Sequence, residues 1–190
     1  MKRYIPVFAL LIVVLCANSY AQDRVRVPRG KAILIDGKFS PGEWQDSEEI
    51  AISDEAKLYF KASEQYVYIC VRLMKANNFG VDMYLSDATK EIHNLHISAK
   101  LGERQLKDKD YPEWQWWTNR DWAANVSRVL SFEERTFLPD EVKELQISRQ
   151  RFKGKQWLTM FEIQTRDSTK AFPTKATNKK TENWLLLEFK

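Results

Sequence analysis

Apolar and polar residues alternate along several short segments of this chain. The clearest case is residues 66–73, whose alternate positions divide into two sets: Val67, Ile69, Val71 and Leu73 against Tyr66, Tyr68, Cys70 and Arg72. A period of two is typical of a β-strand that buries one face. Alternation or a short apolar run of strand length recurs in further segments: 31–35, 57–62, 81–85, 93–99, 157–163 and 184–189. The pattern therefore predicts a chain made mostly of short strands.

Turn signals fit this picture, and helix signals are few. Residues 63–65 separate two strand patterns at the length of a tight hairpin connection. Pro139 and the acids after it suit the first turn of a helix, so a short helix is predicted over 139–145, although 145–149 could instead be a strand. In an antiparallel β-sandwich of two sheets, every strand can bury one face against the other sheet. We therefore predict this fold, with at most that short helix.

The first 21 residues have the features of a secretory signal peptide. Lys2 and Arg3 precede an apolar run over residues 5–15, and small residues lead up to Ala21. The apolar run is too short to cross a bilayer. We therefore expect cleavage after Ala21, and a protein that is exported to the cell surface, the periplasm or the medium.

Cleavage there leaves residues 22–190, the length of one ordinary domain. Cys16 would leave with the signal, and it is a poor lipidation site because Leu15 stands where lipoprotein signals favour a small residue. Cys70 would then be the sole cysteine and could not form an internal disulfide. Its place in a strand pattern predicts a small, half-buried residue.

The charge balance gives no sign of a nucleic-acid partner. The chain has 30 Lys and Arg residues against 26 Asp and Glu residues, a formal charge of +4, and the two signs are interleaved. Only residues 175–180 are locally basic, which favours a solvated loop. We expect neither a nucleic-acid partner nor a transmembrane span in the mature chain.

The order of several motifs resembles a known family. These motifs are Ile33-Leu34-Ile35-Asp36-Gly37 with Gly42-Glu43-Trp44, the hairpin over 58–71, Asp82-Met83-Tyr84-Leu85, and the late strands 157–163 and 184–189. In this order they are similar to the carbohydrate-binding module family 9-like domains, which are related to the DOMON superfamily. The resemblance covers nearly all of residues 22–190 and implies a β-sandwich. Members bind glycans, bind haem or serve as interaction modules, so the fold does not fix the function.

A tryptophan-rich segment contains the candidate ligand surface. It holds aromatic rings together with an arginine: Tyr111, Trp114, Trp116, Trp117, Arg120 and Trp122. Rings of this kind stack on the apolar face of a sugar, while amides, acids and arginine bond its hydroxyls. Alternatively, Trp114 and Trp116 share one strand face that points into the core, and Trp117 takes the other face. Three other tryptophans are expected in the core: Trp44, Trp157 and Trp184.

Candidate sites for calcium, for a metal held by two histidines and for haem are supported by fewer residues. Asp36 and Glu43 could contribute to a calcium site, although Asp36 could equally cap its own turn. His93 and His96 are three residues apart, so on a strand they face opposite sides and cannot chelate one metal. A haem would need axial ligands from these histidines or from methionines such as Met83.

Three functions remain open at this point. The first is a secreted, non-catalytic module that binds a polysaccharide or oligosaccharide by aromatic stacking and acts beside exported glycan-processing proteins. The second is a cell-surface structural or interaction module without a small ligand. The third is a haem-binding DOMON-type domain. No nucleophile motif or phosphate loop is present, which favours binding over catalysis.

Overall fold

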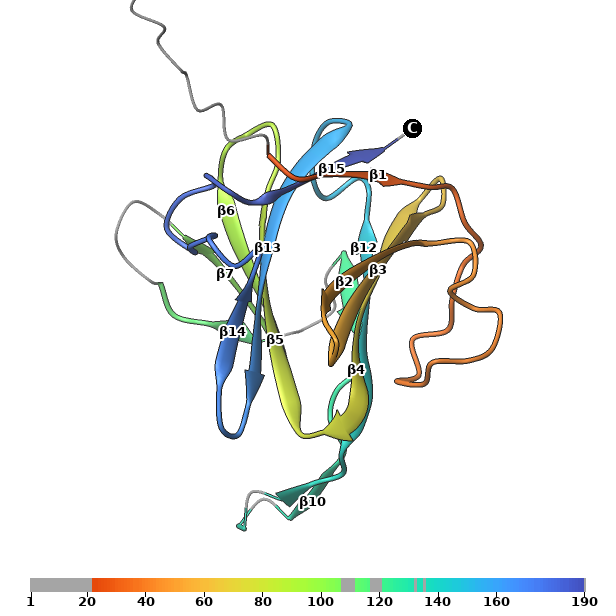
Figure 1. The fold of residues 1–190 in the computed structure, drawn as a ribbon. Coiled ribbons are helices and arrows are strands. Elements are labelled where there is room, and N and C mark those ends of the chain that lie inside the picture. Colours follow the sequence, from red (N-terminus) through yellow and green to blue (C-terminus); the bar gives the residue numbers. More distant parts are fainter. Residues whose placement is uncertain (1–21, 107–111, 117–120, 132, 135, 190) are drawn as a thin grey trace, which may run out of the picture.

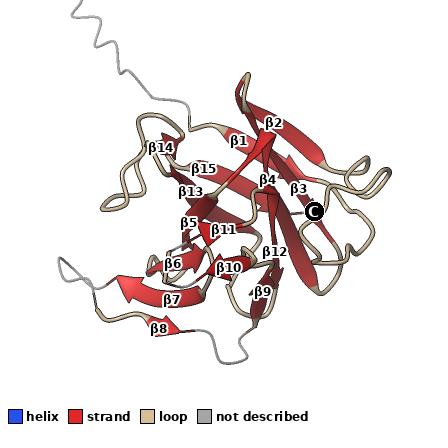
Figure 2. Ribbon diagram, turned by 90° about the horizontal axis from the view of Figure 1, so that it is seen from below, coloured by secondary structure: helices blue, strands red, loops and turns tan. Residues whose placement is uncertain are grey.

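The structure is a computed structural model that describes residues 22–106, 112–116, 121–131, 133–134 and 136–189. Every regular element within these ranges is a β-strand (Figure 1), which confirms the all-β prediction. The same ranges contain no helix that could pass through a membrane. The predicted signal, residues 1–21, lies outside the described residues. Figure 2 shows the strands arranged in two main sheets.

The larger sheet has eight strands. In spatial order they are β1 (Arg24–Val27), β15 (Leu185–Phe189), β13 (Gln156–Thr165), β5 (Phe79–Ser86), β6 (Ile92–Ile97), β7 (Leu101–Leu106) and β8 (Gln115–Trp116), with β14 (Thr169–Phe172) also paired to β13. Only β1 and β15 run parallel, and the other pairs are antiparallel. Continuous pairing from β13 to β8 makes the wide, regular surface on which the candidate site lies.

The smaller sheet faces the larger one and has five strands. They are β2 (Glu48–Ser53), β3 (Ala56–Ala62), β4 (Tyr66–Asn77), β12 (Asp140–Ser148) and β9 (Trp122–Ala124) in spatial order. The predicted hairpin between β3 and β4 is present, and the Ser63 N–H donates to the Tyr66 carbonyl at its turn. A separate two-stranded ribbon joins β10 (Val129–Ser131) and β11 (Thr136–Phe137).

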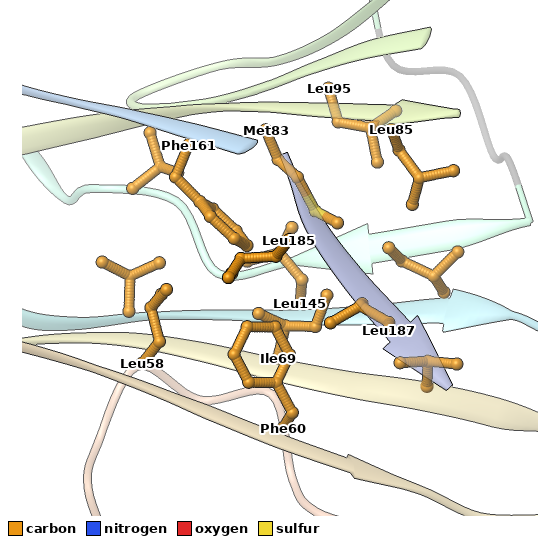
Figure 3. Packing of buried hydrophobic residues seen from close by; sticks show 14 of the residues in the cluster. Leu58, Phe60, Ile69, Met83, Leu85, Leu95, Leu145, Phe161, Leu185 and Leu187 are labelled. Atoms are coloured by element: carbon orange, nitrogen blue, oxygen red, sulfur yellow. The ribbon is translucent and has the colours of Figure 1, made fainter. Parts of the chain in front are cut away.

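The hydrophobic core fills the space between the two sheets. Figure 3 shows side chains of both sheets meeting there: Leu58, Phe60, Ile69 and Leu145 from the smaller sheet, and Met83, Leu85, Leu95, Phe161, Leu185 and Leu187 from the larger. The predicted inward set of residues 66–73 belongs to this cluster. Of the three tryptophans predicted to be buried, Trp157 lies in this core, and Trp44 and Trp184 are buried in two further clusters.

A second apolar cluster lies on the other side of the smaller sheet. Tyr59, Tyr68 and Cys70 point outward from β3 and β4, and they pack against Trp44 of the loop 28–47. Because this loop covers the sheet, Cys70 is fully buried rather than half-buried. Burial raises the pKa of the Cys70 thiol well above its ordinary value, so the thiol stays protonated and unreactive.

The predicted helix over 139–145 is wrong, because this segment belongs to strand β12. Each residue from Val142 to Ser148 pairs with β4, and β9 pairs with the other edge. Leu145 and Ile147 point into the core while Glu144 points outward. A proline and two acids give a weak local preference for a helix, and two hydrogen-bonded neighbouring strands outweigh it.

The predicted strand over 31–35 is also absent. Its apolar residues lie in the loop that covers the smaller sheet, and carboxylates take the place of a neighbouring strand. Asp46 accepts a hydrogen bond from the Lys31 N–H (2.7 Å), and Glu43 accepts one from the Leu34 N–H (3.1 Å). Backbone donors satisfied by side chains need no sheet ladder.

Candidate functional site

Alternate residues of the larger sheet form an outward face on which polar and aromatic side chains lie beside a small apolar cluster around Met160 and Trp184. Cross-strand partners share one face of a sheet, and the pairing places these residues together: Glu162 and Gln164 of β13, Asp82 and Tyr84 of β5, Asn94 and His96 of β6, Gly102 and Arg104 of β7, and Trp116 of β8. We call this set the outer polar face. Between the two sheets the same strands present apolar residues, so strand alternation decides which side chains of each strand share the outward face.

Two tryptophans lie over one edge of the outer polar face. The rings of Trp114 and Trp116 are stacked, with centroids 6.1 Å apart and planes inclined by 25°. Trp116 keeps 48% of its surface exposed, and Trp114 is half-buried. Beneath them is Gly102, where an added Cβ would lie only 3.1 Å from Trp116 and 3.3 Å from Trp114. The missing side chain lets both indoles lie close against β7.

Charged and polar groups surround the two indoles. The Arg104 guanidinium lies 4.1 Å from the centre of the Trp114 ring, and the Lys100 ammonium lies 5.3 Å from that of Trp116. The His96 ring is 5.3 Å from Trp114. Cation–π contacts of this kind hold indole rings in place. The segment thus combines a rigid aromatic surface with adjacent hydrogen-bonding groups.

Asp82 is one of two carboxylates on the outer polar face. One oxygen lies 2.7 Å from Nδ1 of His96, and the other accepts a hydrogen bond from the Gln164 amide at 2.6 Å. Nε2 of His96 lies 2.8 Å from the Ser98 hydroxyl. Each group is therefore held by its neighbour, which fixes the direction in which the remaining lone pairs point.

Glu162 is the second carboxylate and is the cross-strand partner of Asp82. It accepts hydrogen bonds from the Tyr84 hydroxyl (3.1 Å) and from the Asn178 amide (3.2 Å). Burial, together with the charge of Asp82, raises the pKa of Glu162 above its ordinary value. Burial likewise raises the pKa of Tyr84, so its hydroxyl remains a donor at neutral pH.

The structure places the other sequence-predicted ligand residues differently. Trp122 is only 2% exposed and faces the core, where its indole N–H donates to Glu103 (3.1 Å). It offers no ring face to a ligand. Tyr111, Trp117 and Arg120 lie outside the described residues.

Glu103 anchors Trp122 within a buried network. His93, as its spacing predicts, is on the opposite side of β6 from His96, and its Nδ1 lies 3.1 Å from Glu103. Arg151 also donates to Glu103. Burial alone would raise the pKa of this carboxyl, but the bond to His93 and the charge of Arg151 outweigh it and hold the pKa below its ordinary value.

Asp36 and Glu43, the candidate calcium ligands, lie in the loop over the smaller sheet, far from the outer polar face in the topology. The Asp36 carboxylate accepts from the Lys38 N–H (3.0 Å), and Glu43 accepts from Leu34. Between them, Glu144 of β12 accepts hydrogen bonds from the N–H groups of Asp36 and Gly37 at 3.2 and 2.9 Å. Among the described residues, no three His, Cys, Asp or Glu side chains come together as a metal site.

The residues considered as haem ligands are engaged elsewhere. His93 and His96 each contact a carboxylate, and Met83 and Met160 are fully buried in separate clusters. His93 and Met83 lie on the inner side of the larger sheet, and His96 and Met160 on its outer side. The described residues therefore give the haem hypothesis no support.

The sequence singled out the segment that contains Trp114 and Trp116, but it missed most of the polar groups beside them. Asp82, His96 and Glu162 lie on strands that were predicted correctly, and each occupies the position between two inward apolar residues. Polar residues at alternate positions on adjacent strands are the signal that could have found them. Strand order, which decides that β13, β5, β6 and β7 are neighbours, was the missing information.

Three solved structures have a similar fold. A carbohydrate-binding module family 9 protein from Caldicellulosiruptor kristjanssonii, in complex with glucose, is 14% identical, with a TM-score of 0.52 over 88% of this chain and 96% of that one. Its complex with cellotriose gives 13% identity and a TM-score of 0.53 over 88% and 94%. A Bacteroides uniformis protein considered to bind carbohydrate is 10% identical, with a TM-score of 0.52 over 88% and 98%.

The chain has a CBM9-like fold. The predicted β-sandwich and the resemblance on which it rested are confirmed at this level. No family model matches the sequence, and a comparison with curated proteins finds no match either. At identities of 10–14% the similarity establishes the architecture alone, so the function has to be argued from the outer polar face.

Proposed function

We propose that this protein is a secreted, non-catalytic carbohydrate-binding module, and that a polysaccharide or oligosaccharide binds across the outer polar face. The observation that carries the proposal is the half-exposed Trp116, stacked on Trp114, at the edge of a face with two carboxylates, amides and an arginine. An indole covers the C–H face of a sugar ring, and the neighbouring groups are complementary to its hydroxyls. Two structures with this fold, one in complex with glucose and one with cellotriose, support the proposal.

The two carboxylates favour binding over hydrolysis. Asp82 uses both oxygens in hydrogen bonds to His96 and Gln164, and Glu162 uses both in bonds to Tyr84 and Asn178. A glycosidase needs one protonated acid and one free base or nucleophile on either side of the scissile bond. Carboxylates side by side on one sheet face and already engaged suit the recognition of hydroxyls.

Export after removal of residues 1–21 would bring the module to glycans outside the cytoplasm. There it would act beside exported glycan-processing proteins by keeping them near their substrate. A glycan array with the purified protein is the direct test of the binding function. The absence of binding to any glycan on the array would contradict it and would favour a structural or interaction module.

The role of the indole is tested by Trp116→Ala. We expect roughly tenfold weaker binding to the sugars found on the array, equivalent to about 1.4 kcal/mol. The free energy of unfolding should fall by only about 1 kcal/mol, the contribution of one aromatic pair, because the ring is half-exposed. Leu34→Ala is the matched control, since Leu34 is 70% exposed but lies in the loop over the other sheet. Equal affinity of Trp116→Ala and the unmodified protein would refute aromatic stacking at this position.

A further inference from the structure

Asn94 is a buried amide near the centre of the outer polar face. It points outward from β6, with Tyr84 of β5 and Arg104 of β7 as its cross-strand partners, and His96 two residues along on the same face. Its side chain is completely buried. Within the part of the chain that the structure describes, neither the amide oxygen nor the amide nitrogen has a hydrogen-bond partner.

This arrangement is unfavourable for the free protein. A buried amide that loses its bonds to water and gains none in return destabilises the fold, whereas an apolar residue of the same shape would not. Most other buried polar groups of the described chain are satisfied; Glu43 Oε2 and Trp157 Nε1 also lack a partner, but neither lies on the outer polar face. Thr159 bonds the Tyr84 carbonyl, and Lys143 bonds Ser127. Stability therefore does not explain why a buried amide stands at position 94.

The two unpaired atoms define what would satisfy them. The amide oxygen needs a donor and the amide nitrogen needs an acceptor. An alcohol hydroxyl supplies both from one atom, since it donates its hydrogen and accepts through its lone pairs. A carboxylate, which only accepts, and an ammonium, which only donates, would each leave one amide atom unpaired.

We propose that Asn94 binds a hydroxyl group of the ligand, which inserts between Tyr84 and Arg104. The inference rests on the proposed function and adds to it: the sugar is not only stacked at the surface but places one hydroxyl into the sheet face. Arg104 is long, half-buried and opposite Asn94, so movement of its side chain gives the hydroxyl access. Asn94 is thus a specificity-determining residue that selects a polyhydroxy ligand.

The test compares affinity with stability in Asn94→Leu, which keeps the approximate shape and removes both polar atoms. Binding of glucose, cellotriose and the sugars found on the array is measured by titration calorimetry, and thermal unfolding is measured without ligand. We expect at least a tenfold loss of affinity and an unfolding midpoint equal to or above that of the unmodified protein. Asn94→Ala should lose affinity to the same degree despite the cavity that it leaves.

Met160→Leu is the matched control, because Met160 is fully buried on the same side of the larger sheet and has no polar atom to lose. It should change neither affinity nor the midpoint appreciably. Undiminished affinity in Asn94→Leu would overturn the inference, and so would a clearly lower midpoint, which would mark a structural amide satisfied by water. Failure of the unmodified protein to bind any sugar would instead overturn the proposed function and the hydroxyl assignment with it.

Discussion

Glu144 should make the protein less stable as the pH rises through neutrality. Its side chain is fully buried beneath the loop 28–47 and accepts hydrogen bonds from the N–H groups of Asp36 and Gly37 and from the Trp44 indole. Burial, reinforced by the nearby charge of Glu43, raises the pKa of Glu144 from an ordinary 4.5 to about 7. The folded protein therefore binds a proton that the unfolded chain releases at lower pH.

The magnitude follows from proton linkage. A carboxyl whose pKa is raised on folding stabilises the fold most below pH 4.5, and this contribution is lost as the pH rises to about 7. The full loss corresponds to roughly 3 kcal/mol, of which about 2 kcal/mol falls between pH 5.5 and 8. Carboxyls whose pKa is lowered by partners, such as Glu103, act at lower pH and in the opposite direction.

The assay is urea denaturation at several pH values, with Glu144→Gln beside the unmodified protein. The substitution keeps an acceptor oxygen and removes the titration, so the difference between the two curves isolates Glu144 from the other ionisable groups. Glu144→Gln should gain about 2 kcal/mol on the unmodified protein between pH 5.5 and 8. Glu162→Gln measures separately the pH dependence that comes from Glu162, a second described carboxyl whose pKa is raised. Parallel curves for Glu144→Gln and the unmodified protein would refute the reasoning.

Three further predictions concern the core network and the outer polar face. Glu103→Gln removes the buried charge that His93 and Trp122 contact, so we expect the free energy of unfolding to fall by about 3–5 kcal/mol in urea denaturation. A decrease below about 1 kcal/mol would contradict the role of this network. Gly102→Ala should push the Trp116 ring away from β7, and we expect a shifted tryptophan emission and severalfold weaker sugar binding. A crystal structure of the variant in which both indoles keep their positions would contradict this prediction. Sugars whose hydroxymethyl group is oxidised to a carboxylate should bind more weakly than their neutral parents, because the outer polar face holds two carboxylates that repel them. A competition assay measures this, and stronger binding of the acidic sugars would show that attraction to Arg104 dominates instead.

Much of the local structure could be predicted from the sequence. Alternation in residues 66–73 assigned each side chain of the first part of β4 to its face, and the late strands β13 and β15 lie where their patterns placed them. Trp157 and Trp184 are buried as expected. These features depend on near neighbours in the chain, because a period of two is a property of the strand itself.

Predictions failed where the outcome depends on partners outside the segment itself. Residues 31–35 carry a strand-like apolar run, but the carboxylates of Asp46 and Glu43, later in the same loop, accept from the Lys31 and Leu34 N–H groups. Residues 139–145 carry helix-like signals but pair with β4. Cys70 is fully buried only because a loop 23 or more residues earlier in the chain covers it. In each case contacts with residues outside the segment override a weak local preference.

The candidate site shows most clearly what the sequence determines and what the tertiary structure decides. The sequence by itself supplied the indoles of Trp114 and Trp116 and the alternation that sets which side chains share a face. The tertiary structure decided that this face is the outward one, that Asp82, Glu162 and Arg104 lie beside the indoles, and that Trp122 points inward. Alternation fixes two faces for every strand, but strand order and covering loops determine which face is buried and which neighbours it gains.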